Sequence, residues 1–292
     1  METSVLYGKA VSEALKARLK KRIGTLLQKG IRPGLAVVLV GENPASKIYV
    51  RNKARSCEAL GIYSETLRLP ENIGQEKLNA HIDKLNADSR FHGILVQLPL
   101  PAHIDEKEII HRILPVKDVD GFHPVNIGHL VLGEDTFIPC TPAGIMEMLA
   151  FYQIPVSGKH VVIIGRSNIV GKPMANLLYQ KSSKANATVT ICHTGTKDLK
   201  HHTLQADILI VAAGIPEIVT GDMVKEGVTV IDVGVNRVQD ATRKKGYRLV
   251  GDVAFDSVKK HAAAITPVPG GVGLMTIAML MQNTVKAAEN HV

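Results

Sequence analysis

Short hydrophobic runs alternate with amphipathic stretches along most of the chain. The runs are rich in Val, Ile and Leu and predict strands at residues 34–40, 62–69, 93–98, 160–164, 187–192, 208–212 and 228–233. Helices are predicted between and after them, at residues 43–60, 75–88, 105–113, 143–151, 174–180 and 275–289. The alternation predicts an α/β fold built on parallel sheets.

A further helix is predicted near the N-terminus, and it carries the densest basic run of the chain, residues 16–22. Val11, Leu15, Leu19 and Ile23 recur every four residues through this run and form one apolar face. Basic residues beside such a face are typical of a solvated helix surface. The formal net charge of +8 (35 − 27) leaves two explanations, a nucleic-acid surface or a small anionic ligand. We favour the ligand and expect no nucleic-acid partner.

The length of the chain, 292 residues, suggests two domains at a prior of roughly 150 residues each. Pro139 and Pro142 mark the expected boundary. We expect a first domain at residues 1–142, a second at 143–273, and a C-terminal helix, 274–292, that packs back onto the first. The strand and helix spacing of the second domain is typical of a Rossmann-like, doubly wound nucleotide-binding sheet.

Composition excludes several classes of protein. With 45% hydrophobic and 21% charged residues the chain is expected to fold around a sizeable core. No apolar run approaches the roughly 20 residues of a membrane span, and the first ten residues lack a secretory signal, so we expect a cytoplasmic protein without membrane contact. The three cysteines are far apart, which predicts reduced thiols and no metal site.

The strongest local motif is a glycine-bearing turn between a predicted strand and a helix, Ile163 to Pro173. Such a turn brings backbone N–H groups to a pyrophosphate, although a purely structural turn is the alternative. It is not a Walker A loop, because Arg166 stands where that motif needs glycine and Pro173 where it needs Ser or Thr.

The residues after this turn favour NADP over NAD. An NAD site needs a carboxylate at the end of the second strand, whereas a 2′-phosphate needs a cation and hydroxyl donors. Asp198 is the one acidic residue between Gly171 and Asp207, and the strand ends instead at His193 and Thr194.

A second constellation lies in the first domain. Tyr49 and Lys53 are four residues apart, so on a helix they share one face. An aromatic ring beside a lysine could stack a planar ligand and place an amine on it, but this spacing is also common on ordinary surface helices. Gln97 ends a predicted strand, where ligands bind at sheet edges or where the side chain caps backbone groups. Asp120 lies in a predicted loop, where a carboxylate is ordinarily a solvated turn residue.

Taken together, the motifs resemble one enzyme family over nearly the whole chain. In order they are VGENPASKIYVRNK, GILVQLPLP, KDVDGFHP, PCTP, GRSNIVGKP, ATVTICHT, IDVGVN, VGDV and TPVPGGVG. The chain thereby resembles the bifunctional methylenetetrahydrofolate dehydrogenase/cyclohydrolase family. That resemblance implies two α/β domains flanking a cleft, NADP on the second domain, a tetrahydrofolate one-carbon derivative as substrate, and a homodimer.

The resemblance also implies roles for particular residues. Lys53 is the catalytic lysine, Tyr49 packs on the folate, Gln97 holds Lys53 and Asp120 bonds the pterin. Further substrate contacts are implied at Val96, Gln97, Leu98, Pro267, Pro269, Gly270, Gly271, Gly273 and Leu274. Cofactor contacts are implied at Gly165, Arg166, Ser167, His193, Thr194 and Val235.

Three positions depart from the family pattern: Leu274 replaces a common proline, and Thr194 and Val235 replace Ser and Ile. The expected activity is oxidation of methylenetetrahydrofolate with NADP, followed by hydrolysis of the methenyl product to 10-formyltetrahydrofolate. The rivals are another NADP dehydrogenase with a Lys–Asp pair and a basic nucleic-acid-binding protein.

Overall fold

The computed structural model describes residues 2–243 and 246–291 and divides into two compact units. The three-stranded unit comprises Ala14–Cys140 and Ile277–Val292, and the six-stranded unit comprises Met1–Glu13 and Thr141–Thr276. The first 13 residues therefore group with the later segment, whereas the sequence analysis assigned them to the first domain. The physical reason is that β1 (Ser4–Val5) pairs in parallel with β11 (Ala264–Ile265).

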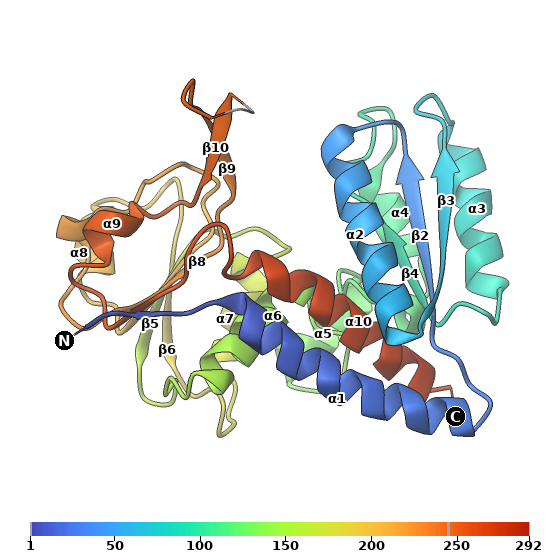
Figure 1. The fold of residues 1–292 in the computed structure, drawn as a ribbon, viewed down its shortest axis with the longest axis horizontal. Coiled ribbons are helices and arrows are strands. Elements are labelled where there is room, and N and C mark those ends of the chain that lie inside the picture. The colour runs from blue at the N-terminus through green and yellow to red at the C-terminus, as the bar shows by residue number, and fades with distance from the viewer. Residues whose placement is uncertain (1, 244–245, 292) are drawn as a thin grey trace. The chain divides into compact units, whose positions relative to one another are not determined.

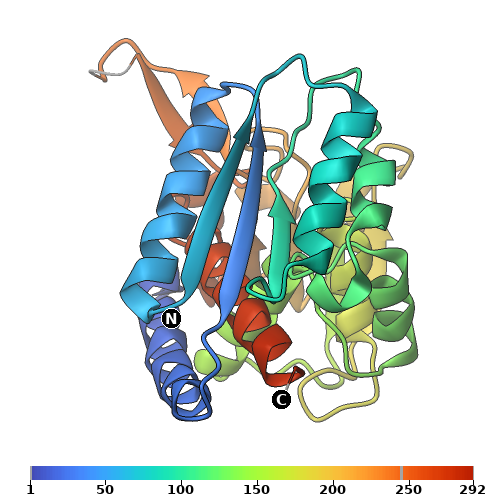
Figure 2. The ribbon, with the colours of Figure 1, turned by 90° about the vertical axis from the view of Figure 1, so that its right-hand side faces the viewer.

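The three-stranded unit is built on a parallel sheet in the order β3-β2-β4. Its strands are β2 (Gly34–Val40), β3 (Tyr63–Leu69) and β4 (Gly93–Val96), and every residue of β2 is buried. Its helices are α2 (Pro44–Leu60), α3 (Gln75–Ala87), α4 (Glu106–Arg112) and α5 (Pro124–Leu132), with a short 3₁₀ helix at Pro115–Lys117. Figure 1 shows α2 and α3 on opposite sides of the sheet, and Figure 2 shows the three strands side by side.

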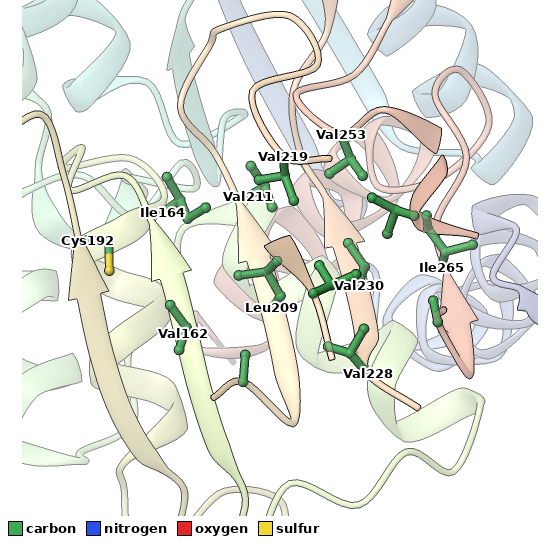
Figure 3. Close-up of a cluster of buried hydrophobic side chains, with 14 residues drawn as sticks. Val162, Ile164, Cys192, Leu209, Val211, Val219, Val228, Val230, Val253 and Ile265 are labelled. Carbon is green, nitrogen blue, oxygen red and sulfur yellow. The ribbon is translucent and has the colours of Figure 1, made fainter. Parts of the chain in front are cut away.

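The six-stranded unit has the strand order β1-β11-β8-β7-β5-β6, all parallel. The remaining strands of this sheet are β5 (His160–Ile164), β6 (Thr188–Cys192), β7 (Ile208–Val211) and β8 (Thr229–Asp232). Its short helices are α7 (Gly171–Leu178), α8 (Leu199–Thr203) and α9 (Phe255–Val258), with a 3₁₀ turn at Gly221–Met223. Val162, Leu209 and Val230 belong to the apolar core on one face of this sheet (Figure 3).

The strand order places a topological switch point between β5 and β7. From β5 the chain passes to β6 on one side and then returns to β7 on the other. In doubly wound sheets, ligands bind at the carboxyl ends of the strands at such a point. The loops that follow β5 and β7 therefore form the expected ligand edge of this unit.

Three longer helices and one hairpin complete the fold. The helices are α1 (Gly8–Gln28), α6 (Cys140–Phe151) and α10 (Gly273–Glu289). The hairpin consists of β9 (Asn236–Gln239) and β10 (Tyr247–Val250), which pair with each other as an antiparallel two-stranded sheet. Figure 1 shows it extending away from the sheet of the six-stranded unit.

The α/β class and the doubly wound parallel sheet are confirmed, and the local differences include two helices. Helix α5 was not predicted as a helix, and α7 begins at Gly171 rather than at Met174. The predicted start fell after Pro173, but proline is tolerated in the first turn, where a missing N–H leaves no helical bond unmade.

Candidate active site

A lysine–glutamine pair lies at the carboxyl end of the three-stranded sheet. Helix α2 carries Lys53, and Gln97 directly follows β4. The Lys53 Nζ donates a hydrogen bond to Gln97 Oε1 at 2.9 Å. The Gln97 Nε2 donates to the Leu98 carbonyl at 2.7 Å, and this second bond fixes the amide so that its oxygen faces the lysine. Gln97 therefore both satisfies a backbone carbonyl and holds the amine.

Burial changes the protonation chemistry of Lys53. It lowers the pKa of the ammonium below its ordinary value, and nearby Asp120 and Cys140 offset only part of that effect. A depressed pKa increases the fraction of neutral amine, which is the form that can accept a proton. Helix position, a fixed partner and a lowered pKa together make Lys53 a candidate general base.

The loop after the 3₁₀ helix is organised by a different carboxylate, Asp118. Its oxygens accept bonds from the Gly121 N–H at 3.1 Å, the His123 N–H at 2.7 Å and the Asn126 Nδ2 at 2.9 Å. Gly121 has φ +74°, and a Cβ there would lie 2.7 Å from the Phe137 carbonyl oxygen. The turn therefore requires glycine, and it fixes the backbone that carries Asp120.

Asp120 itself is left without such support. Among the described residues of the three-stranded unit, no hydrogen bond or ion pair holds its carboxylate. Burial raises the pKa of Asp120 to about 6, an effect that Lys53 opposes and Asp118 reinforces. A carboxylate that is half-buried, charged above pH 6 and unpaired is suited to accept hydrogen bonds from a ligand. A solvated turn residue, the alternative from sequence, does not fit its burial.

Cys140 is a neighbour of this group that sequence reasoning did not assign to the site. Its side chain is 4% exposed, and burial raises the pKa of the thiol well above its usual value. The Sγ lies 3.7 Å from the Val119 carbonyl oxygen, and Asn283 Nδ2 donates to the same carbonyl at 2.8 Å. A neutral, enclosed thiol that interacts electrostatically with Lys53 and Asp120 does not act as a nucleophile. All three cysteines of the chain are free and buried, as expected for reduced thiols.

The other predicted substrate residues fall into two groups. Tyr49 lies one turn before Lys53 on α2 and is 51% exposed, so its ring is available to a ligand. Val96 is buried in β4, and Leu98 is half-buried just beyond it. The structure thus places these residues around the Lys53–Gln97 pair.

The second group belongs to the six-stranded unit, so the structure does not by itself place it with Lys53. Its members are Pro267, Pro269, Gly270, Gly271, Gly273 and Leu274. The Gly270 carbonyl accepts from the Gly8 N–H at 2.9 Å, and a Cβ on Gly8 would lie 2.2 Å from the Gly271 oxygen. The loop is therefore held closely against the start of α1, while Leu274 remains 45% exposed.

The glycine turn after β5 has the properties of a dinucleotide site. Gly165 has φ +119°, and a Cβ there would lie 2.3 Å from the Ala212 oxygen, so the loops after β5 and β7 meet at this glycine. Ser167 Oγ accepts from the Val170 N–H at 3.1 Å and closes the entry to α7. Arg166 is exposed, and within residues 2–243 and 246–291 its guanidinium has no ion-pair partner.

The end of β6 offers donors and no carboxylate. The backbone N–H of His193 donates to Thr196 Oγ1 at 2.8 Å, and the His193 Nδ1 accepts from the Gly195 N–H at 3.0 Å, which fixes the turn and leaves Thr194 exposed. Asp198 accepts from the His201 N–H and caps α8. His193 and Thr194 therefore fit a 2′-phosphate better than a pair of ribose hydroxyls. Val235, the remaining predicted contact, is 53% exposed after β8.

Two properties of the described residues concern metal ions and membranes. In the described ranges, no three His, Cys, Asp or Glu side chains come together in a way that could hold a metal ion. No helix within those ranges has the length and apolar character needed to cross a bilayer.

A doubly wound sheet with a glycine turn at its switch point, together with a lysine–glutamine site on a second α/β unit, defines a nucleotide-dependent enzyme. Residues 6–120 match the catalytic domain of tetrahydrofolate dehydrogenase/cyclohydrolase, and residues 139–292 match its NAD(P)-binding domain. The chain belongs to the tetrahydrofolate dehydrogenase/cyclohydrolase family.

Relatives and solved structures agree over nearly full length. The chain is 56% identical over 287 residues to the bifunctional protein FolD of Chlorobium phaeobacteroides, covering 97% of this chain and 96% of that one. The crystal structure of the FolD enzyme from Campylobacter jejuni superimposes with a TM-score of 0.94 at 53% identity, covering 99% and 100%. That of the Trypanosoma brucei enzyme, complexed with NADP cofactor and inhibitor, gives 0.93 at 40% identity, covering 100% and 99%.

Proposed function

We propose that the chain oxidises 5,10-methylenetetrahydrofolate with NADP and hydrolyses the resulting 5,10-methenyltetrahydrofolate to 10-formyltetrahydrofolate. The observation that carries this proposal is the Lys53–Gln97 hydrogen bond beside the unpaired Asp120. It combines an amine of lowered pKa with a carboxylate available to a heterocycle, which are the groups that a folate hydrolysis site needs.

The oxidation step asks mainly for alignment. The reacting carbon is flanked by two nitrogens, whose lone pairs stabilise the cation that forms when hydride leaves. Tyr49 and Asp120 would fix the pterin by stacking and by hydrogen bonds, and Lys53 helps by position rather than by proton transfer. When bound, the nicotinamide supplies the hydride acceptor. Arg166, His193 and Thr194 would hold the 2′-phosphate. Ser167 and the glycine turn would support the pyrophosphate.

The hydrolysis step asks for a base and then an acid. A neutral Lys53 accepts a proton from the water that attacks the methenyl carbon, and a C–O bond forms. The resulting ammonium can return a proton to the ring nitrogen as the C–N bond breaks and the hydroxyl becomes the formyl carbonyl. One proton is released overall. Gln97 keeps the amine at the reacting carbon during both transfers.

The two domains expected from the sequence divide the ligands in this proposal. Folate binds to the first domain, residues 1–142 with the C-terminal helix 274–292, and NADP to residues 143–273. The match of residues 139–292 to an NAD(P)-binding domain supports the second assignment. The exposed Arg166 and the absence of a carboxylate at the end of β6 support NADP over NAD.

We also propose a homodimer that works in the cytoplasm. The β9–β10 hairpin supports the dimer, because an isolated two-stranded sheet is marginal in water and its outer edges can pair with a second copy. The three free, buried thiols support a reducing compartment. Light scattering of the purified chain measures the mass, and a monomer at micromolar concentration would remove the dimer.

A pair of assays tests the activity. Absorbance is followed after methylenetetrahydrofolate is mixed with NADP or NAD, and the decay of added methenyltetrahydrofolate is followed separately against its spontaneous rate. We expect oxidation with NADP and accelerated decay without any cofactor. Failure of both reactions, with salt-dependent retention of nucleic acid on filters instead, would favour the basic nucleic-acid-binding rival.

A further inference from the structure

Two buried carboxylates in the six-stranded unit have no part in the mechanism above. Asp232 ends β8, and Asp252 follows β10. They are 3% and 0% exposed, and no lysine or arginine forms an ion pair with either of them within the described part of the chain. A buried charge without a cation is costly unless many donors surround it. The donors around these two carboxylates are therefore informative.

Asp252 ties together two loops at the ligand edge of the sheet. Its Oδ2 accepts from the Ala213 N–H at 2.7 Å and from the Gly214 N–H at 2.8 Å, both in the loop after β7. Its Oδ1 accepts from Asn236 Nδ2 at 2.8 Å, in the segment after β8. One side chain thus fixes the distance between the loops that follow two neighbouring strands.

Asp232 fixes the same region from the other side. Its Oδ1 accepts from the Gly234 N–H at 2.9 Å and from the Asp252 N–H at 3.0 Å, and its Oδ2 accepts from the Val253 N–H at 3.0 Å. Asp232 therefore holds the backbone that carries Asp252. Burial raises the pKa of Asp232 to about 7, although three backbone donors favour its charged form.

Two glycines show how closely the backbone approaches this pair. A Cβ on Gly251 would lie 1.7 Å from Asp232 Oδ2, and a Cβ on Gly234 would lie 2.2 Å from Asp252 Oδ1. A side chain at either place would displace the carboxylate that the glycine faces. The motifs IDVGVN and VGDV therefore pack against each other, and each supplies one carboxylate and one glycine to the contact.

The two carboxylates hold the segment around Val235 at the ligand edge of the sheet. Val235 lies between Gly234, whose N–H is bound by Asp232, and Asn236, whose side chain is bound by Asp252. Arg166 and Thr194 lie at the ends of β5 and β6, on the far side of β7 from β8. If those two residues take the adenosine 2′-phosphate, the nicotinamide half of the dinucleotide extends toward the loops after β7 and β8.

We propose that Asp232 and Asp252 are positioning residues for the nicotinamide half of NADP, acting through the loops at residues 213–214 and 234–236. They touch neither the folate nor the adenosine end. They hold the backbone at which the nicotinamide is aligned for hydride transfer, so their loss reduces the population of the binding-competent loops. This inference rests on the proposed dehydrogenase function. It adds that different residues of the ligand edge serve the two halves of the cofactor.

The test compares two isosteric changes in the same unit. Asp252→Asn introduces an amide that cannot accept from all three donors. The matched control is Asp207→Asn at the amino end of β7, where the carboxylate accepts from the His160 N–H at 2.8 Å and pairs with Lys225 at 2.7 Å. Each variant is titrated with NADP and with adenosine 2′,5′-bisphosphate, and both activities are measured.

We expect Asp252→Asn to weaken NADP binding at least about tenfold, the effect of leaving about a tenth of the loops competent. Its affinity for adenosine 2′,5′-bisphosphate and its cyclohydrolase rate stay within about twofold of wild type. The control leaves all these quantities within about twofold. Unchanged NADP affinity in Asp252→Asn overturns the proposal, as does an equal loss for NADP and the bisphosphate.

Two further measurements keep the outcome clear. If Asp252→Asn does not fold, Asn236→Leu removes a single donor at a half-buried position and should weaken NADP in the same selective way. A nonselective or absent effect in that variant also overturns the proposal. The titrations need no folate, so a wild-type chain that binds NADP yet lacks both activities would count against the proposed function and not against this inference.

Discussion

Asp252 of the six-stranded unit and Asp120 of the three-stranded unit differ in how far the fold satisfies their carboxylates. In the six-stranded unit, Asp252 is fully enclosed and its oxygens are bound by three donors of its own unit. In the three-stranded unit, Asp120 is half-buried and no described group of that unit bonds it, although Asp118, only two residues earlier, has three donors. The first arrangement holds backbone in place, and the second leaves acceptor capacity for something that is not part of the protein.

This difference separates support from chemistry. Groups that touch substrate need unused hydrogen-bonding capacity and perturbed protonation, which cost stability, whereas supporting groups are satisfied by the fold itself. This comparison leads to a general expectation. Variants near Lys53 should affect hydrolysis or both reactions, and variants at the ligand edge of the six-stranded unit should affect oxidation alone.

The largest expected effect follows from Lys53→Met. The variant retains the apolar stem but has no base, so cyclohydrolase activity should fall at least about 100-fold, the lower end of what a positioned base contributes. Dehydrogenase activity should stay measurable, because hydride transfer needs no proton movement. Methenyl product should therefore accumulate in the coupled assay.

The matched control is Lys47→Met. Lys47 lies on the same helix, is half-buried and pairs with Glu42, away from Gln97. Both activities should stay within about twofold of wild type. If Lys53→Met hydrolyses methenyltetrahydrofolate as fast as wild type, the lysine is not the base and the proposed mechanism is wrong.

Asp120→Ala is expected to impair both reactions. The carboxylate is proposed to anchor the pterin by charge-assisted hydrogen bonds, and losing them should lower kcat/KM for each reaction by about 10–100-fold. Steady-state kinetics of the two half-reactions measure this loss. Asp105→Ala, which removes an exposed helix cap in the same unit, provides the comparison. Unchanged folate kinetics in Asp120→Ala would return this residue to an ordinary turn position.

At the cofactor edge, Arg166→Ala should act on oxidation alone. An exposed guanidinium can bond the 2′-phosphate of NADP but has no such partner in NAD. We expect kcat/KM to fall about tenfold more with NADP than with NAD, while methenyl hydrolysis is unchanged. Lys172→Ala is the control, because Lys172 follows the same turn and is bound to Asn168. Equal losses with both cofactors would contradict the assigned role.

The sequence predicted the regular parts of this arrangement better than its supports. Buried runs such as residues 35–40 and 161–164 predict strands because every residue in them is apolar. The two-residue strands β1 and β11 are too short for any periodicity. Helix α5 was missed because Pro124 and Gly128 interrupt its apolar pattern, although His123 caps it by accepting from the Val125 N–H.

The same limit applies to the candidate site. Lys53, Gln97 and Asp120 were identified by their motifs, and the Lys53–Gln97 contact is as the resemblance implied. Cys140 was expected to be a reduced thiol, but its place near this site was not predicted, since that place depends on contacts with Val119 and Asn283. Asp232 and Asp252 were quoted within motifs without a role, because their donors come from loops that only the folded sheet brings together.

The smallest expected effect is on stability, and it tests whether Asp120 is kept at a cost. Its pKa is raised from 3.8 to about 6 in the folded chain. Well below pH 3.8 both states hold the proton and ionisation costs nothing. As the pH rises from about 4 through 6, the unfolded chain releases its proton more readily, so this residue reduces stability across that window and above it. Asp120→Asn should therefore raise the free energy of unfolding at pH 7.5 by the order of 1 kcal/mol, since the two-unit shift sets a ceiling of about 3 kcal/mol and the amide is still buried. That gain corresponds to about 2–4 °C in Tm. It should shrink toward zero at pH 4, which thermal melts of both proteins at the two pH values would reveal.

Asp118→Asn is the matched comparison two residues away, and it should lower the Tm at pH 7.5, because its three donors favour the carboxylate. If Asp120→Asn is also destabilising at pH 7.5, Asp120 is a supporting carboxylate like Asp252, and the contrast between the two units fails.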